Sequence, residues 1–327
     1  MSNFQPKQLV SAGREAVVAA DYNPQKLIFI HAGISAAVSF LVALMTYLLE
    51  LGMAQGGGLS GMSHLAALET AQALLDTLLS ILSPFWALGF IAAAIHLARR
   101  ESATPHTLLT GLHRWGPALR MLMAEGLIYV VVMWISIQIG SYVYVLTPFS
   151  QPLMELLQQL VPAADSMNIE AALQVLEGLD DKAILHMILT ALPFTVLPGL
   201  IAVILLSYRM RLAPYVLMDE PRCGAIYAIT MSFKLTKKHT LELFRLDLNF
   251  WWFYLLELLI TALCYGDMLL PLLGAKLAMD PVLATFLFYA LALIGQVGLY
   301  VWQKPQVFAT YALFNDSLIP VETGNDQ

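Results

Sequence analysis

Charged residues are scarce in this chain. Asp, Glu, Lys and Arg make up 12% of its 327 residues, whereas a soluble domain carries about 25%. The deficit excludes an ordinary soluble domain and indicates that lipid is the main solvent of the chain. A membrane β-barrel is disfavoured, because its strands alternate apolar and polar residues over ~10 positions, and the apolar runs here are continuous and longer.

Cysteine and the short motifs of familiar enzymes are scarce as well. The two cysteines, Cys223 and Cys264, are expected at opposite ends of membrane spans, which predicts neither a disulfide nor a metal framework. No phosphate-binding glycine loop, HExxH or GxSxG motif occurs. We therefore expect no cofactor, no metal site, no nucleic-acid partner and no enzyme of a familiar type. An enzyme of an unfamiliar type stays open as a third possibility.

Six apolar runs are present instead, and each is long enough for a transmembrane helix of roughly 20 residues. They cover residues 27–49, 77–98, 121–148, 183–208, 248–266 and 281–303. The first run is too long for a signal-peptide core and lacks a convincing small-residue cleavage site, so we expect it to be retained. The runs predict an all-α integral membrane protein with six transmembrane helices.

The basic residues predict the orientation of these spans. Of the 17 Lys and Arg residues, 15 fall before the first run, between the second and third, between the fourth and fifth, and after the last. The other gaps hold only Lys182 and Lys276, and they are acidic. Because Lys and Arg are retained on the cytoplasmic side, both termini should be cytoplasmic. The acidic residues of these outer loops have two explanations: they keep the loops soluble, or they form a vestibule that attracts cations.

A repeated unit is visible along the chain. Pro6, Pro105 and Pro221 each open a short amphipathic stretch on the predicted cytoplasmic side, and proline is favoured at the first position of a helix. The unit is thus a cytoplasmic interfacial helix followed by a transmembrane hairpin. Residues 213–220 (APYVLMDE) and 309–316 (ATYALFND) echo one another. We predict a single membrane domain, residues 1–327, with repeats at 1–100, 101–212 and 213–316 and a flexible tail at 317–327.

The segment from 208 to 259 resembles the bacterial polytopic membrane family known as domain of unknown function 975. The matching features are an acidic turn before a proline, a basic helix with a serine, an Asp-Leu step into the next span, and a closing Tyr-Ala-Leu-Phe. In this chain they are Asp219-Glu220-Pro221, Ser232 with Lys234, Lys237 and Lys238, Leu246-Asp247-Leu248-Asn249-Phe250 with Trp252, and Tyr311-Ala-Leu-Phe314. Asn249 replaces the expected serine, and the usual glycine of the basic stretch is absent.

The resemblance covers roughly the last third to half of the chain. The family is itself similar to the membrane domain attached to some glycerophosphodiester phosphodiesterases. What the resemblance implies is a multi-pass protein of the bacterial plasma (inner) membrane, with six helices and no catalytic residues. It implies no particular biochemical activity, because the family has none that is settled.

Glu257 is the first candidate for a functional site, since it lies near the middle of the fifth apolar run. A carboxylate at bilayer depth costs at least ~2.5 kcal/mol and usually marks a pathway or a paired site. Three roles are open for this carboxyl group: a proton or cation site, a ligand for a polar lipid headgroup, or a structural hydrogen bond between helices. Gln138 and Gln296 are its candidate partners.

Two further groups of residues stand out. Pro84, Pro193 and Pro198 lie inside the second and fourth runs, where broken helices free backbone carbonyls. The second group consists of basic residues that suit anionic lipid headgroups, although orientation alone also explains them. It contains Arg209, Arg211, Arg222, Lys234, Lys237, Lys238 and Arg245.

Two functions therefore remain. The first is a non-enzymatic membrane protein that binds lipids, above all anionic headgroups on the cytoplasmic side, or a membrane-protein partner. The alternative is a small secondary transporter or lipid-handling permease that uses Glu257.

Overall fold

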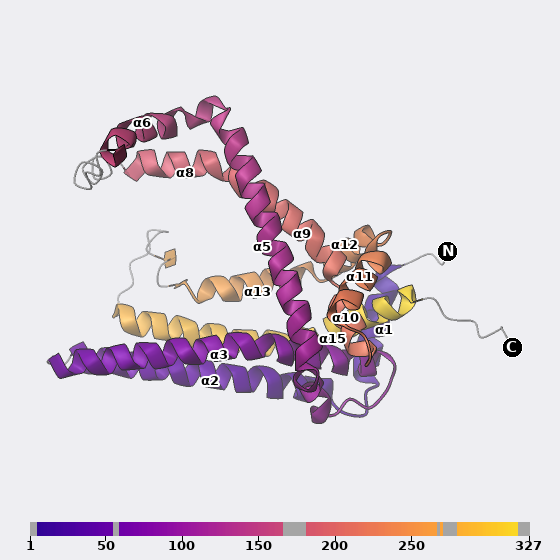
Figure 1. The fold of residues 1–327 in the computed structure, drawn as a ribbon. Coiled ribbons are helices and arrows are strands. Elements are labelled where there is room, and N and C mark those ends of the chain that lie inside the picture. The colour runs from indigo at the N-terminus through magenta and orange to yellow at the C-terminus, as the bar shows by residue number, and fades with distance from the viewer. Residues whose placement is uncertain (1–4, 55–58, 166–180, 267–268, 271–279, 320–327) are drawn as a thin grey trace. The chain divides into compact units, whose positions relative to one another are not determined.

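A computed structural model describes residues 5–54, 59–165, 181–266, 269–270 and 280–319. Every regular element in these ranges is a helix, and they contain no strand (Figure 1). The α-helices are α1 (Pro6–Val18), α2 (Pro24–Ala54), α3 (Leu59–Ala98), α4 (Thr110–His113), α5 (Trp115–Val145), α6 (Gln151–Asp165), α8 (Asp181–Thr195), α9 (Leu197–Met210), α10 (Ala213–Asp219), α11 (Ala225–Thr236), α12 (Thr240–Asn249), α13 (Trp251–Leu263) and α15 (Pro281–Leu318). Two 3-10 helices are η1 (Pro105–Leu109) and η2 (Pro148–Ser150).

Five helical stretches among the described residues are long and apolar enough to cross a membrane. They are Pro24–Leu48, Ile81–Ala98, Trp115–Val145, Leu185–Asp219 and Leu283–Leu318. Counting the bent pair of α12 and α13 as one span raises the number to six. The prediction of an all-helical chain with several membrane-spanning helices is confirmed. The arrangement as six spans in three hairpins stays a prediction.

The apolar run at 248–266 does not form one straight helix. α12 and α13 meet at Phe250 with an angle of 67° between them, because Phe250 leaves the helical conformation and its N–H bonds to the Asp247 carbonyl three residues back. α13 then has 13 residues, which is about 20 Å at 1.5 Å per residue. The sequence changes character at this point, since α12 carries Glu242, Arg245 and Asp247 whereas α13 is almost wholly apolar. That change marks an entry into the apolar run but does not specify an angle.

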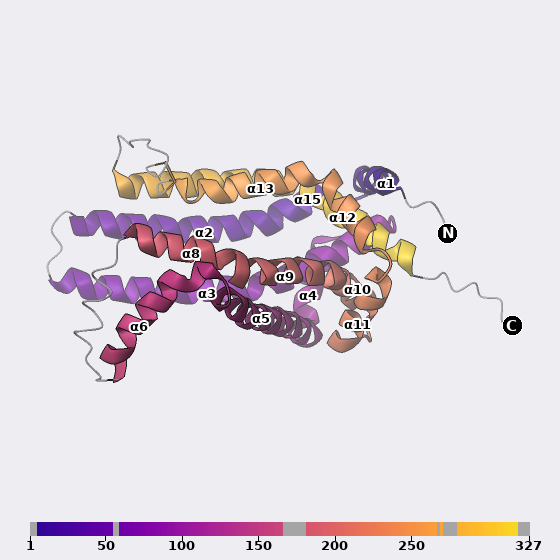
Figure 2. The ribbon, with the colours of Figure 1, turned by 90° about the horizontal axis from the view of Figure 1, so that it is seen from above.

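The chain divides into two compact units, Met1–Leu122 with Arg211–Gln327, and Met123–Met210. In the first unit α2, α3 and α15 lie side by side in both views (Figures 1 and 2). Leu27 and Ile28 of α2 pack there with Phe90 of α3. The ring of Phe90 meets the ring of Phe308 edge-on at 5.2 Å. This core fixes α15 against α2 and α3.

The three stretches that follow Pro6, Pro105 and Pro221 contain helices. Two of these helices pack closely against a neighbouring helix at a glycine. A Cβ on Gly13 of α1 would lie 2.2 Å from Thr310 Oγ1 of α15, and a Cβ on Gly89 of α3 would lie 1.8 Å from the Leu108 carbonyl oxygen of η1. Any side chain at these two positions would push the helices apart. The third stretch begins at Ala225 rather than at Pro221, because residues 220–223 form a turn.

In the second unit α5 packs against the junction of α8 and α9. A Cβ on Gly140 would lie 2.0 Å from the Phe194 carbonyl oxygen. The Tyr144 hydroxyl donates to the Phe149 carbonyl at 3.0 Å, which ties the end of α5 to η2. This unit therefore depends on one close backbone approach at a glycine.

Candidate functional site

The ends of α3, α10 and α15 are joined by Arg99. Its guanidinium donates two hydrogen bonds to Asp219 at 2.6 and 2.8 Å, and two to Asp316 at 3.1 and 2.8 Å. The hydrogen bonds that Arg99 donates to Asp219 and then to Asp316 raise the pKa of Arg99 above its ordinary value. We call this group the Arg99 bridge. Because Asp219 and Asp316 belong to the two echoed segments, the bridge holds those segments together.

A second polar group, the Asp247 cluster, joins α12, α13 and α15 to the segment between α9 and α10. It consists of Arg211, Asp247, Tyr254 and Tyr311. Arg211 Nη2 lies 3.1 Å from Asp247 Oδ1 and 2.9 Å from the Tyr254 hydroxyl. Both tyrosine hydroxyls donate to Asp247, and the guanidinium lies 4.7 Å from the centre of the Tyr311 ring. A buried carboxylate is tolerated only when it is paired and hydrogen-bonded, and the cluster meets both conditions.

Glu257 heads a third group, on α13. The Tyr300 hydroxyl of α15 donates to Glu257 Oε1 at 2.7 Å, and Gln296 Nε2 donates to the Tyr300 hydroxyl at 3.1 Å. The structure thus brings the predicted pair Glu257 and Gln296 together through Tyr300. Gln138 lies on α5 in the other compact unit, where its side chain is exposed.

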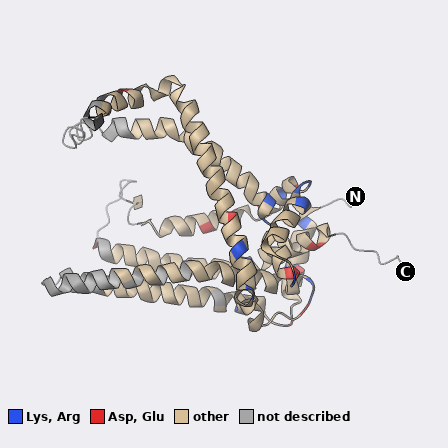
Figure 3. Cartoon of the chain, viewed as in Figure 1, with Lys and Arg blue, Asp and Glu red and all other residues tan. Residues whose placement is uncertain are grey.

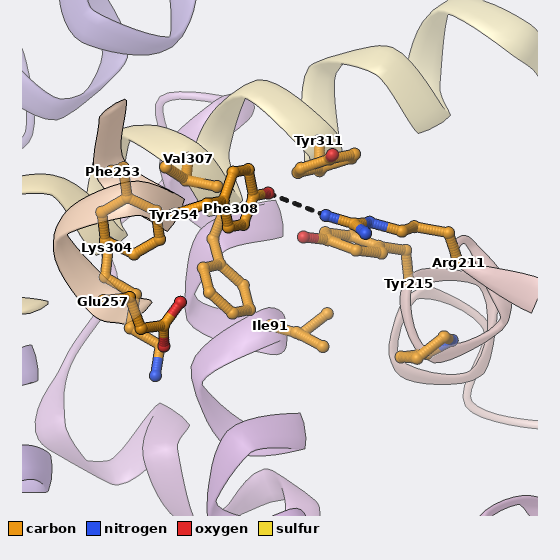
Figure 4. A pocket seen from close by; sticks show the side chains of 11 residues that line it. Ile91, Arg211, Tyr215, Phe253, Tyr254, Glu257, Lys304, Val307, Phe308 and Tyr311 are labelled. Carbon is orange, nitrogen blue, oxygen red and sulfur yellow. Dashed lines mark hydrogen bonds between the residues drawn. The ribbon is translucent and has the colours of Figure 1, made fainter. Parts of the chain in front are cut away.

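A pocket of about 300 Å³ lies between the Asp247 cluster and Glu257 (Figure 4). Its residues are Ile91, Arg211, Pro214, Tyr215, Phe253, Tyr254, Glu257, Lys304, Val307, Phe308 and Tyr311. The Lys304 Nζ lies 3.8 Å from the centre of the Tyr300 ring. Among the described residues no carboxylate lies within 4 Å of this Nζ, so Lys304 and Glu257 line one pocket without forming an ion pair.

The pocket therefore combines apolar walls with separated charges. Phe253, Val307 and Phe308 supply apolar surface, and Lys304 and Glu257 supply one charge of each sign. This composition suits an amphiphile, meaning a molecule with a polar and an apolar part. Sequence reasoning missed Tyr300 and Lys304. The position of Lys304 directly after the last apolar run was a signal that could have identified it.

The predicted basic residues fall into two groups in the first unit. Arg211 is engaged in the Asp247 cluster, whereas the remaining members are exposed. Those exposed residues are Arg222, Lys234, Lys237, Lys238 and Arg245. Figure 3 shows the basic residues gathered around α11 and α12. Arg209 lies in the last turn of α9 in the other unit and is half-buried. Spacing along the chain did not distinguish an internal ion pair from an exposed charge.

The candidate kink prolines differ from one another. Pro84 lies inside α3, which continues without a break. Pro193 lies inside α8, and Pro198 is the second residue of α9, so the interruption falls at Val196 between the two helices. Pro198 lacks the N–H that would bond to the Phe194 carbonyl, and that carbonyl faces the close approach of Gly140. The carbonyl is therefore covered by α5.

No three His, Cys, Asp or Glu side chains within the described ranges are arranged to hold a metal ion. The two cysteines are both free.

A model of the family described as "Protein of unknown function (DUF975)" matches residues 7–314. The chain belongs to this family. The match reaches well beyond the segment on which the resemblance was recognised, so the first half of the chain follows the family pattern too. Searches of curated proteins and of solved structures found no match. The similarity to the membrane domain of glycerophosphodiester phosphodiesterases stays a prediction.

Proposed function

We propose that this protein binds a polar lipid in the pocket between α13 and α15 and does not alter it chemically. The observation that carries the proposal is that Glu257 and Lys304 lie in one pocket whose other walls are mostly apolar. The proposal takes the chain as a multi-pass protein of a bacterial inner membrane. Its six spans form three hairpins, and both termini are cytoplasmic.

The position of the pocket along the spans supports a headgroup as its occupant. Residues 281–303 form 23 residues of helix before Lys304, about 34 Å at 1.5 Å per residue, and the hydrocarbon core is ~30 Å thick. Lys304 therefore falls at the level of the headgroups. The ring centres of Trp252 and Trp302 lie 5.1 Å apart, Trp302 comes two residues before Lys304, and tryptophan is enriched at that level. Glu257 shares the pocket, so it lies nearer the surface than its place in the apolar run predicts.

The exposed basic residues give lipids a second point of contact. Lys234, Lys237, Lys238 and Arg245 have exposed side chains around α11 and α12. Basic residues beside a span attract anionic headgroups by about 1 kcal/mol per charge. This surface would also suit an acidic segment of a membrane-protein partner.

The test is native mass spectrometry of the full chain extracted with its own lipids. We expect the wild type to retain a discrete number of lipids and the double variant Glu257→Gln/Lys304→Gln to lose at least one of them. The control is Lys7→Gln/Glu15→Gln, which makes the same change in charge at two exposed side chains of α1. Equal lipid retention by the pocket variant and the control would refute the proposal, as would a wild type without lipid.

A second candidate function is a small transporter or lipid-handling permease. It is favoured by the Glu257 carboxylate, because Oε1 accepts from Tyr300 and no hydrogen bond to Oε2 is found among the described residues. In proteoliposomes with an internal pH-sensitive dye, a transporter should move protons and Glu257→Gln should abolish that flux. A wild type without flux excludes proton-coupled transport. A binding protein instead depends on Lys234, Lys237 and Lys238, and neutralising all three should reduce its attachment to anionic vesicles.

A further inference from the structure

We infer that the pocket selects a zwitterionic headgroup, in which a primary ammonium is joined to a phosphodiester. This inference rests on the proposed lipid binding and specifies its ligand. The ammonium would lie against Glu257 and the phosphate against Lys304.

The first support is the separation of the two charges. Glu257 comes from α13 and Lys304 from α15, and Figure 4 shows both side chains on one side of the pocket. They form no ion pair within 4 Å in the described part of the chain. Glu257 Oε2 can still accept a hydrogen bond, and the ammonium of Lys304 has three N–H donors. A ligand with one charge of each sign satisfies both groups at once.

The second support is the balance of charge around the pocket. Arg211 is already paired with Asp247 at 3.1 Å, so the charges left for a ligand are those of Lys304 and Glu257. A purely anionic headgroup would pair with Lys304 but leave the Glu257 carboxylate uncompensated in an apolar pocket, which is costly. The pocket therefore favours a headgroup without net charge.

The third support distinguishes a primary ammonium from a trimethylated one. Trimethylammonium groups are recognised over the open faces of aromatic rings. Here Lys304 Nζ lies 3.8 Å from the centre of the Tyr300 ring and 5.7 Å from that of Phe308, and the Arg211 guanidinium lies 4.7 Å from that of Tyr311. The remaining aromatic rings of the pocket contact other rings, Tyr215 that of Tyr311 and Phe253 that of Tyr254. A trimethylammonium also has no N–H to donate to the Glu257 carboxylate. The geometry thus favours ethanolamine-type headgroups over choline-type ones.

The experiment measures headgroup preference. Purified full-length protein in detergent is incubated with equal amounts of phosphatidylethanolamine, phosphatidylcholine and phosphatidylglycerol of matched acyl chains, and the retained lipids are counted by native mass spectrometry. Of the three lipids, only phosphatidylethanolamine can donate a charge-assisted hydrogen bond from an ammonium to Glu257, so we expect the wild type to prefer it by about tenfold. Glu257→Gln should abolish this preference. Lys304→Gln should reduce retention of all three lipids, and Lys7→Gln, at an exposed position outside the pocket and outside the basic residues of α11 and α12, should leave both quantities unchanged.

The outcomes separate the two proposals. If the wild type retains lipids without preference among headgroups, or if the preference survives in Glu257→Gln, the inference is wrong while lipid binding stands. If it retains none, lipid binding itself is wrong. A last arm adds water-soluble phosphoethanolamine at the same concentration. We expect phosphoethanolamine not to displace the lipid, because the apolar walls of the pocket require acyl chains. Displacement would show that the pocket binds the free solute rather than a lipid. Monodisperse elution of each variant shows that it is folded.

Discussion

Replacing Arg99 by glutamine removes a guanidinium that bonds to Asp219 and Asp316 at the same time. The two aspartates lie at the end of α10 and near the end of α15, and Arg99 directly follows α3. Without the guanidinium, two carboxylates face one another with no cation between them. We expect the first compact unit to become less stable as a result.

The magnitude follows from the exposure of the bridge. The Arg99 side chain is 36% exposed, and those of Asp219 and Asp316 are 16% and 28% exposed, so water screens both ion pairs. Exposed pairs contribute about 0.2–1 kcal/mol each. Repulsion between the two carboxylates adds about 1 kcal/mol if they stay ~4 Å apart in a water-like medium. The expected loss in the free energy of unfolding is therefore about 2 kcal/mol.

The assay is unfolding of the detergent-solubilised chain, followed by tryptophan fluorescence. At roughly 2 °C per kcal/mol for a large chain, the midpoint of Arg99→Gln should fall by about 4 °C. Arg99→Lys should fall by about half as much, since an ammonium cannot bond to both carboxylates in the forked geometry of a guanidinium. The difference in midpoint between the wild type and Arg99→Gln should become smaller when the salt concentration is raised from 0.1 to 1 M, because the screening length falls from about 10 to about 3 Å.

The neighbouring residue supplies the control. Arg100 is exposed, and Arg100→Gln removes the same charge without breaking the bridge. A double-mutant cycle with Asp219→Asn should give a coupling energy of about 1 kcal/mol to Arg99. The reasoning is refuted if Arg99→Gln costs no more than Arg100→Gln, or if that coupling is close to zero.

Three further predictions concern single positions, the first two by the same unfolding assay. Gly89→Ala should lower the free energy of unfolding by about 3 kcal/mol, because its Cβ would lie 1.8 Å from the Leu108 carbonyl oxygen. Gly126→Ala, where the Cβ meets open space, should raise it by up to about 1 kcal/mol. Equal effects of the two substitutions would contradict this. Arg100→Gly should stabilise by about 1 kcal/mol, since Arg100 has φ 59 where α3 ends, and a loss would contradict it. Burial raises the pKa of the Cys223 thiol, so its alkylation, followed by mass spectrometry, should be slower in the folded than in the unfolded chain, and equal rates would argue against burial. Because the folded chain holds that proton more tightly, the thiol's contribution to stability is present below the pKa of the unfolded chain and lost as the pH rises above it.

The helical class and most spans were predictable from the sequence. Long uncharged runs can satisfy their backbone polar groups in lipid as helices, and five of the six runs coincide with helices long enough to span. The bend at Phe250 was not predictable, because the change from the charged α12 to the apolar α13 does not specify the angle at which the two helices meet. The continuation of α15 past Lys304 to Leu318 was also missed. That final stretch is stabilised by buried contacts of Val307, Ala309 and Phe314 rather than by a uniformly apolar sequence.

The candidate site was only partly predictable. Glu257 and Gln296 stand out as polar residues in apolar runs, and both belong to one hydrogen-bonded chain. Their link, Tyr300, does not stand out, because tyrosine is common in membrane helices. Arg211 resembled its basic neighbours in sequence, yet it pairs with Asp247, 36 positions away. Separating a paired arginine from an exposed one requires the position of its partner in space.

The sequence by itself determined that this chain is helical, that it is built for a membrane and that it belongs to its family, because those properties depend on local composition and on motifs. Only the tertiary structure decided which polar groups meet. Tyr300 reaches Glu257 across 43 positions, and Arg99 reaches Asp316 across 217. Such pairs depend on how helices pack, and packing depends on close approaches such as that of Gly89 to Leu108. The pocket that brings Glu257 and Lys304 together is therefore a consequence of the fold.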